Sequence, residues 1–127
     1  MYPLNHYLRN EHNLTGHEYP HLNCWGLVVY WYKNELGIEL NYYTSLNQKN
    51  MSEGEVKEKA HFKEVRAPSE GTVCAFYDGR GILYHVGVYT HGKLLHTHKG
   101  GTKWESVGNA IRFKNVTVRY YDYGARD

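Results

Sequence analysis

The chain has 127 residues, the usual size of one domain and long enough to bury a core without disulfide bonds. Hydrophobic residues make up 41% and charged residues 22%, a balance that excludes the disordered and fibrous classes. The formal net charge is +2 and no run of like charges occurs, so we expect neither a nucleic-acid partner nor, without a long apolar run, membrane insertion. We expect a single domain over residues 1–127.

The first residues, Met-Tyr-Pro-Leu-Asn-His, lack both a basic start and a following apolar run. We therefore expect a chain made in the cytoplasm without a signal peptide, which another carrier must deliver if it acts beyond a membrane. Cys24 and Cys74 are expected to be free thiols, with Cys74 buried in a strand.

Residues 23–37 predict a helix with a signal at each end. Asn23 is a favoured N-cap, and Gly37 is a favoured residue just beyond a helix C-terminus. One apolar stripe recurs at helical spacing and comprises Leu27, Val28, Trp31 and Leu36. Cys24 falls in the first turn of this helix.

The rest of the chain predicts one more helix and then strands. Ser52 and Glu55 form a capping-box pattern for a short charged helix that runs to about Val65, and Pro68 ends it. The hydrophobic period then changes to two, which predicts an antiparallel meander of strands at residues 72–77, 82–90, 93–98 and 110–121. Helices followed by such a meander indicate the α+β class.

The position of Cys24 has two interpretations. A thiol in the first turn of a helix lies near unpaired N–H groups and the positive end of the helix dipole, which favours the nucleophilic thiolate. Alternatively, Cys24 is a small apolar residue of the core.

A hairpin brings histidines together in the predicted meander. If His91 and Gly92 form a two-residue turn, Thr90 pairs with Lys93, and counting back places Gly87 opposite His96. Period-two alternation then gives one shared face to a group of side chains: His85, Gly87, Tyr89, Leu94, His96 and His98. His85 and His96 become diagonal neighbours about 7 Å apart, close enough for a base and the group that orients it. Gly87 leaves room on this face for another side chain or a substrate.

Other interpretations of these histidines stay open. The chain has nine histidines, so neighbours by chance are common, and an exposed strand face tolerates them. His96 and His98 also have the spacing of two metal ligands on a strand, but no familiar zinc-binding spacing supplies a third ligand.

Two segments resemble a known family. Residues 23–28, Asn-Cys-Trp-Gly-Leu-Val, with the later Glu-Leu-Gly-Ile at 35–38, are similar to the cysteine segment of NlpC-type peptidases of bacteriophage tail tips. Residues 85–89, His-Val-Gly-Val-Tyr, and His96 resemble the histidine motifs of that family. The resemblance spans about residues 19–101.

The resemblance implies a compact papain-like fold, in which a helix that carries the nucleophile packs on a small antiparallel sheet. It implies that Cys24 attacks a peptide carbonyl, His85 transfers the proton and His96 orients His85, with His98 as an alternative third member. It implies no metal and no cofactor. The expected reaction is hydrolysis of peptidoglycan stem peptides, commonly at a γ-D-glutamyl to diaminopimelate bond.

Substrate contacts are expected at Asn23, Trp25, Tyr19 and Gly87. Asn23 stands where the family usually has aspartate, a position associated with the free amine of the substrate. A tyrosine upstream of the cysteine often assists the oxyanion site, for which Tyr7 and Tyr19 are candidates, and the backbone N–H near Cys24 is the other candidate donor.

The resemblance also implies phage tail-tip proteins as partners and a place in the virion, with action in the periplasm or cell wall. Two other functions remain open at this stage. The chain is alternatively a tail structural subunit that keeps the fold without catalysis, or a secreted antibacterial amidase toxin.

Overall fold

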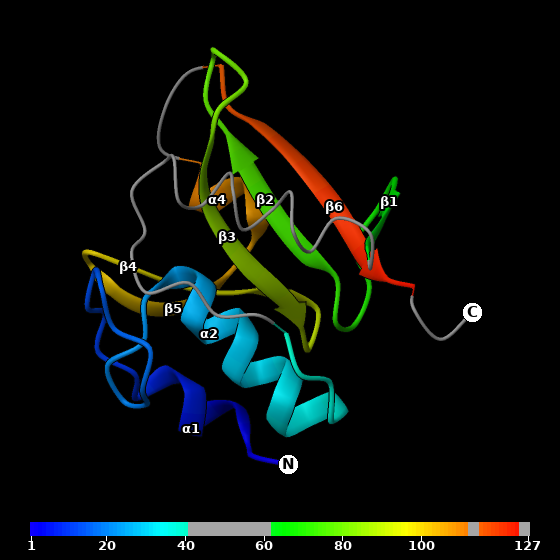
Figure 1. Cartoon of the computed structure of the whole chain (residues 1–127). Helices are drawn as coiled ribbons and strands as arrows, with labels where there is room; N and C mark the ends of the chain where they lie inside the picture. The colour runs from blue at the N-terminus through cyan, green and yellow to red at the C-terminus, as the bar shows by residue number, and fades with distance from the viewer. Residues whose placement is uncertain (41–61, 112–114, 125–127) are drawn as a thin grey trace.

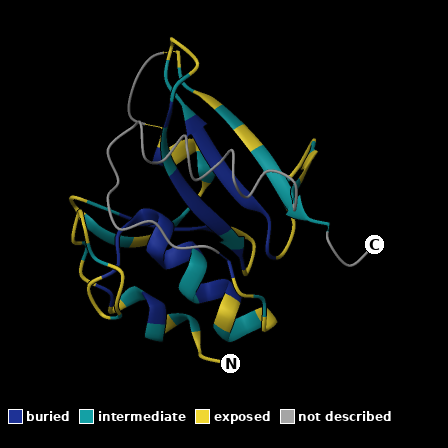
Figure 2. Cartoon of the chain, in the orientation of Figure 1, coloured by how far each residue is buried: buried dark blue, intermediate teal, exposed yellow. Residues whose placement is uncertain are grey.

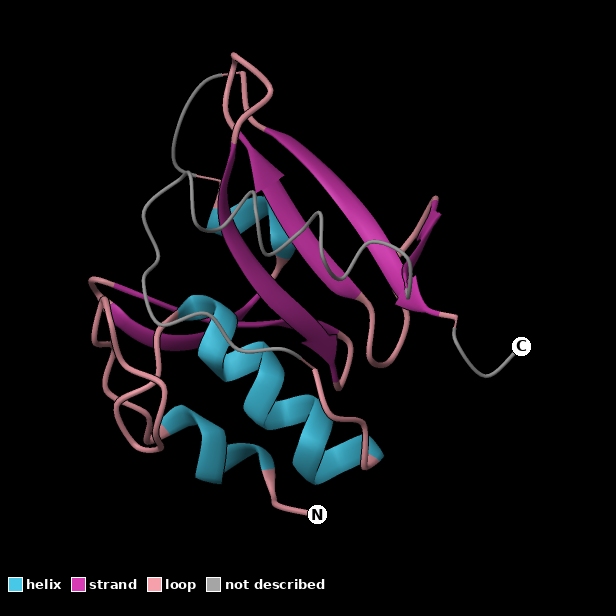
Figure 3. Ribbon diagram, in the orientation of Figure 1, coloured by secondary structure: helices cyan, strands magenta, loops and turns pink. Residues whose placement is uncertain are grey.

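The computed structural model describes residues 1–40, 62–111 and 115–124. Its helical elements are α1 (Leu4–Leu8), α2 (Cys24–Trp31), η1 (Tyr32–Leu36) and α4 (Val107–Ala110). Its strands are β1 (Phe62–Val65), β2 (Val73–Tyr77), β3 (Leu83–Thr90), β4 (Lys93–His98), β5 (Gly101–Glu105) and β6 (Thr117–Tyr123). The arrangement confirms the predicted α+β class (Figure 3).

The six strands form one antiparallel sheet in the order β1-β6-β2-β3-β4-β5. Strand β6 therefore lies between β1 and β2 (Figure 1). The sheet thus differs from the predicted meander, in which neighbouring strands follow one another along the chain. Only the stretch from β2 to β5 follows chain order across the sheet.

Helix α2 begins at the predicted residue, and together with η1 it extends to the predicted C-terminal glycine. The side chain of Asn23 accepts a hydrogen bond of 2.7 Å from the Gly26 N–H, which is the N-cap interaction. The helix continues into the π-helical turn η1, which ends at Gly37 with a φ of +68°. The wider π-helical turn changes the direction in which its last side chains point. Leu36 is therefore 38% exposed and does not continue the predicted apolar stripe of the helix. Among the described residues, no helix has both the length and the apolar character to cross a membrane.

The sheet is covered on both faces. The apolar side of α2 packs on one face in a cluster that includes Leu27, Val28, Val73, Ala75 and Val88. The alternate residues of β2 point to the other face, where a smaller cluster contains Cys74, Phe76, Leu94 and Ala110. Figure 2 shows that most of β2, much of β3 and the start of α2 are buried.

The helix predicted from Ser52 is wrong at its C-terminal end. Its residues 52–61 lie outside the described residues, but Phe62–Val65 forms strand β1 and pairs with β6 from Phe62↔Tyr123 to Val65↔Tyr120. Pairing with a distant strand has decided the conformation of this charged segment against its local helix signal.

The region between residues 99 and 116 also differs from the expectation. A strand was predicted to start near Ala110, whereas residues 107–110 form helix α4, with Ser106 as its N-cap through a hydrogen bond from the Asn109 N–H. Strand β5, which precedes that helix, was not predicted.

The hairpin between β3 and β4 has the predicted register at its turn. Thr90 pairs with Lys93, and His91 and Gly92 have φ angles of +54° and +82°, as a type I′ turn requires. The pairing of β3 with β4 reaches Val88↔Leu95 and goes no further within this hairpin. Beyond that point, the earlier half of β3 pairs with β2, and the later half of β4 pairs with β5.

Candidate active site

The Cys24 thiol lies where β3 has separated from β4. Cys24 is the first residue of α2 and is 6% exposed. The backbone N–H of Val86 forms a hydrogen bond with its sulfur. Because Val86 directly follows His85, this contact places the sulfur against the backbone beside the predicted base.

Burial raises the pKa of the Cys24 thiol to about 11, and the backbone N–H groups of Val86, Trp25 and Cys24 itself oppose part of that rise. One of the two interpretations of Cys24 held that the helix start favours the thiolate, but desolvation outweighs that effect. The thiol of the free protein is therefore protonated near neutral pH, and it needs a base before it reacts.

His85 and His96 form the histidine pair of the site. Nε2 of His85 lies 2.7 Å from Nδ1 of His96, and the centres of the two rings are 4.9 Å apart. His85 packs on Phe76, its partner in β2, with ring centres 5.3 Å apart. His98 is farther from His85, with ring centres 6.3 Å apart, so His96 is the member of this pair that bonds to the His85 ring.

Glu105 extends the pair into a chain of three side chains. Oε2 of Glu105 lies 2.6 Å from Nε2 of His96, and His96 is 1% exposed. Glu105 is the last residue of β5 and pairs with Leu94 of β4. Glu105 was not predicted because strand β5 was missed. Continuing the hairpin count past residues 99 and 100, which pairs His98 with Gly101, is the signal that would have found it.

His96, His98 and Glu105 each offer an atom that binds metals, and these atoms lie within 4.8 Å of one another. The hydrogen bonds favour another interpretation. Both ring nitrogens of His96 already have partners, and Nδ1 of His98 accepts a hydrogen bond of 3.0 Å from the Gly100 N–H. A His98 whose Nδ1 is an acceptor carries its proton on Nε2 when neutral, and that nitrogen then has no lone pair for a metal. We therefore interpret the group as a hydrogen-bonded relay.

A comparison with known families decides which family the chain belongs to. The model of the NlpC/P60 family matches residues 9–121. The chain belongs to the NlpC/P60 family. No curated protein matches the chain.

A solved structure supports the same fold. The chain is similar to the crystal structure of the NlpC/p60 domain of the peptidoglycan hydrolase SagA, with a TM-score of 0.59 and 19% sequence identity. The match covers 91% of this chain and 89% of that chain. The α+β fold described above is thus the papain-like fold of the NlpC/P60 family, a family of cysteine peptidases.

The residues expected to contact substrate in this NlpC/P60 domain are mostly buried. Asn23 is fully buried, and beyond capping α2 its Nδ2 donates a hydrogen bond of 3.2 Å to the Leu14 carbonyl. Trp25 is 8% exposed within the α2 core cluster. The space beside Gly87 is taken by Leu94 and His96, so the room left by this glycine serves another side chain.

The two candidate oxyanion tyrosines of the NlpC/P60 domain lie along α2 rather than beside Cys24. The Tyr7 hydroxyl donates to Glu35, near the end of η1. The Tyr19 hydroxyl donates to the His6 carbonyl at 2.8 Å, and its ring stacks on Tyr30, six residues beyond Cys24 in α2. Their contacts position the N-terminal segment, which leaves the backbone N–H groups near Cys24 as the oxyanion candidates.

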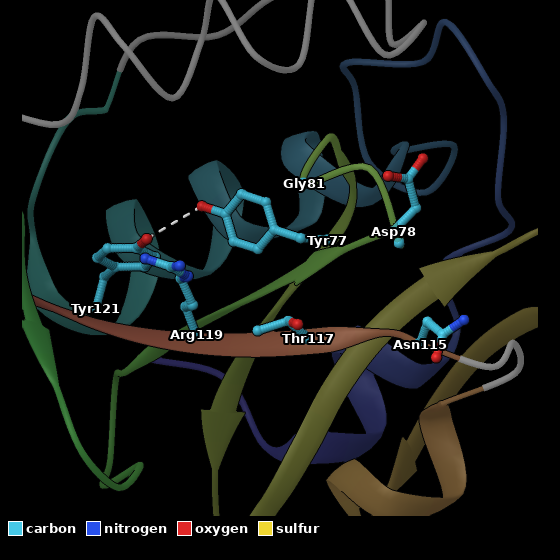
Figure 4. Close-up of a pocket in the computed structure, with 8 residues that line it drawn as sticks. Tyr77, Asp78, Gly81, Asn115, Thr117, Arg119 and Tyr121 are labelled. Carbon is cyan, nitrogen blue, oxygen red and sulfur yellow. Dashed lines mark hydrogen bonds between the residues drawn. The ribbon is translucent and has the colours of Figure 1, made fainter.

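A polar pocket of about 610 Å³ lies over β2 and β6, away from the histidine relay (Figure 4). Tyr77, Arg119 and Tyr121 gather at one end, where the two tyrosine hydroxyls are 3.0 Å apart, and Asp78 and Asn115 lie at the other end. None of the described residues that line this pocket belongs to the relay or to α2.

Proposed function

We propose that the chain is a cysteine endopeptidase that cleaves stem peptides of peptidoglycan, with Cys24 as nucleophile and His85 as base. The observation that carries the proposal is the placement of the Cys24 sulfur against the Val86 N–H, one residue after His85, whose ring is held by His96. Covalent catalysis needs a nucleophile, a base and a third group that orients the base, and we propose that Cys24, His85 and His96 take these roles.

The proposed reaction has two steps. Nδ1 of His85 takes the thiol proton, and the Cys24 sulfur bonds to the peptide carbonyl carbon. The His85 imidazolium then gives this proton to the leaving amine as the peptide bond breaks, which leaves a thioester. Water, deprotonated by His85, attacks the thioester, and the carboxylic acid product and the free thiol are formed. The Cys24 backbone N–H at the start of α2 is the proposed donor to the oxyanion.

Two findings support the substrate class. The chain belongs to the NlpC/P60 family, and the similar solved domain comes from a protein named as a peptidoglycan hydrolase. A γ-D-glutamyl to diaminopimelate bond is the proposed scissile bond, on the resemblance of the cysteine and histidine motifs.

Incubating purified protein with defined muropeptides, and identifying the products by mass spectrometry, tests the activity. Wild type is expected to release fragments, Cys24→Ala to release none, and Cys74→Ala to remain active. Cys74 is the matched control because it is also a buried free thiol, in strand β2 and not at the start of α2. Absence of fragments with wild type, or equal cleavage by Cys24→Ala, contradicts the proposal.

We also propose that the protein acts in a phage tail tip, in association with other tail proteins, during assembly or penetration of the cell wall. The support is the resemblance of residues 23–28 and 85–89 to tail-tip peptidases. Mass spectrometry of purified virions tests this location, and consistent absence of the protein from infectious particles contradicts it.

An idle tail-tip subunit is the second candidate function. The observations that favour it are the low exposure of Cys24 and the raised pKa of its thiol. In that case particles that carry Cys24→Ala assemble and infect normally. A loss of infectivity with Cys24→Ala, but not with Cys74→Ala, favours the peptidase.

A further inference from the structure

The Glu105 carboxylate is hydrogen-bonded to His96 of the histidine pair. Its side chain is 18% exposed, and it lies 2.6 Å from the nearly fully buried His96. A carboxylate partly withdrawn from water beside a buried ring makes a stronger hydrogen bond than the same pair on an open surface.

We propose that Glu105 is a positioning residue, which fixes the protonated nitrogen of His96 and, through it, that of His85. This inference rests on the proposed function, and it adds a member that the cysteine and histidine motifs do not contain. Glu105 acts through His96 and does not itself touch substrate.

The order of protons follows from the two bonds. An ionised carboxylate only accepts hydrogen bonds, so Nε2 of His96 carries the proton directed at Glu105. Nδ1 of a neutral His96 then has a lone pair, and it accepts the proton on Nε2 of His85 at 2.7 Å. Nδ1 of His85 is left with the lone pair that a base uses.

The charge of Glu105 adds to this effect during the reaction. When His85 takes the thiol proton, the new positive charge lies two hydrogen bonds from the carboxylate. Because His96 between them is buried, water screens this attraction weakly. Glu105 thus favours the protonated form of His85 that the first step produces.

The sheet supplies the geometry at the junction of β5 and α4. Glu105 pairs with Leu94, which is two residues before His96 and on the same face of β4. Ser106, the next residue, caps α4 and ends the strand. The carboxylate is therefore held diagonally across from the His96 ring by two paired strands and a helix start.

Three variants separate orientation from charge. Glu105→Gln keeps the size and an accepting oxygen but removes the charge, Glu105→Leu removes both, and Glu105→Asp keeps the charge on a shorter side chain. Glu64→Gln is the matched control, because Glu64 is a 52% exposed carboxylate of the same sheet whose ion pair is with Arg119 at 3.7 Å.

The first readout is steady-state kinetics on the muropeptide substrate. We expect kcat to fall about 10- to 100-fold in Glu105→Leu and less in Glu105→Gln, with little change in KM. The acid limb of the kcat profile is expected to move to lower pH in Glu105→Gln, and Glu105→Asp to recover part of the loss. The proposal is overturned if Glu105→Leu has the same kcat as wild type. It is also overturned if every variant loses kcat/KM only through a higher KM, with kcat unchanged.

The second readout is independent of substrate. Nitrogen-15 NMR of the histidine rings is expected to show His96 protonated on Nε2 in wild type and in Glu105→Gln, and a mixture of protonation states in Glu105→Leu. A wild-type His96 protonated on Nδ1 overturns the proposal. If the predicted NMR states are found but no muropeptide is cleaved by wild type, the proposed function fails and the relay stands.

A chelator distinguishes the relay from a metal centre built on the same side chains. Dialysis of the whole protein against EDTA is expected to leave activity and the His96 spectrum unchanged. Loss of activity on chelation that zinc restores overturns the relay.

Discussion

Gly87 and His96 lie on facing strands so closely that a methyl group on the glycine would stand 2.8 Å from the Cβ of His96. It would also meet Leu94 Cδ1 at 2.7 Å and the Leu95 carbonyl oxygen at 2.8 Å. Real Cβ atoms essentially never come so close to other heavy atoms, so the bare backbone at this position is what lets the His96 ring approach His85.

We therefore expect Gly87→Ala to push β4 away from β3 and to damage both stability and activity. Overpacking at such a site costs about 1–3 kcal/mol of unfolding free energy, and the lost His85–His96 contact adds a drop in kcat. Urea unfolding and muropeptide assays measure the two effects. Gly108→Ala in α4 is the control, since nothing lies within 4 Å of its Cβ position. Equal behaviour of the two variants contradicts the prediction.

Replacing Asn23 by aspartate is expected to destabilise this chain. Aspartate keeps the acceptor for the Gly26 N–H but loses the donor to the Leu14 carbonyl, and it introduces a charge at a fully buried position. A loss of about 1–3 kcal/mol is expected in urea unfolding. Asn109→Asp, at an exposed residue of α4, is expected to change stability by less than about 0.5 kcal/mol. An Asn23→Asp variant as stable as wild type would be inconsistent with this account.

Reactivity of the Cys24 thiol is expected to rise steadily up to high pH. Its pKa is raised to about 11 from a reference value of 9.0, so the protonated form persists well above neutral pH. Alkylation by a small reagent, followed in a Cys74→Ala background, measures this profile. A plateau of the rate near neutral pH would instead indicate that the thiolate is already paired with a protonated His85.

The raised pKa of the Cys24 thiol also makes the free energy of unfolding depend on pH. Because folding favours the protonated thiol, its stabilising contribution is complete below about pH 9 and is lost as pH rises toward 11. In that window wild type is expected to lose up to about 1.4 kcal/mol per pH unit more than Cys24→Ala. Unfolding curves at several alkaline pH values provide the comparison, and parallel losses in the two proteins would refute the link.

The contact between Tyr7 and Glu35 is expected to hold α1 against the end of η1. Tyr7 is 1% exposed, its hydroxyl donates to Glu35, and the backbone N–H of Tyr2 also donates to this carboxylate at 2.8 Å. Tyr7→Phe is expected to cost about 1–2 kcal/mol in thermal or urea unfolding. Tyr89→Phe loses only an exposed hydrogen bond to the Gly92 carbonyl and serves as the control. A Tyr7→Phe variant no weaker than that control would show the contact to be unimportant.

The local signals for α2 and for the β3–β4 hairpin were sufficient to predict them from sequence. The cap at Asn23, the left-handed Gly37 and the two-residue turn at His91 and Gly92 each specify a backbone geometry within a few residues. The proximity of the His85 and His96 side chains followed from counting along that hairpin. Their roles in catalysis stay predictions.

What sequence reasoning missed depends on distant partners. The sequence that precedes Phe62–Val65 has a helix-capping pattern. Phe62–Val65 nevertheless forms a strand, because β6, more than fifty residues later, pairs with it. Glu105 comes close to His96 only because β5 pairs with β4. The raised pKa of the Cys24 thiol results from burial, which depends on the packing of the whole domain. Each of these depends on tertiary contacts that a single short window of sequence does not contain.

The insertion of β6 between β1 and β2 also bears on how the chain folds during synthesis. Until residues 117–123 have left the ribosome, β1 has no strand in the described sheet to pair with, and β2 exposes an unpaired edge. The nascent chain must keep this edge from joining other chains while α2 and the central hairpin are already able to form. The sheet can therefore be completed only after β6 has been synthesised.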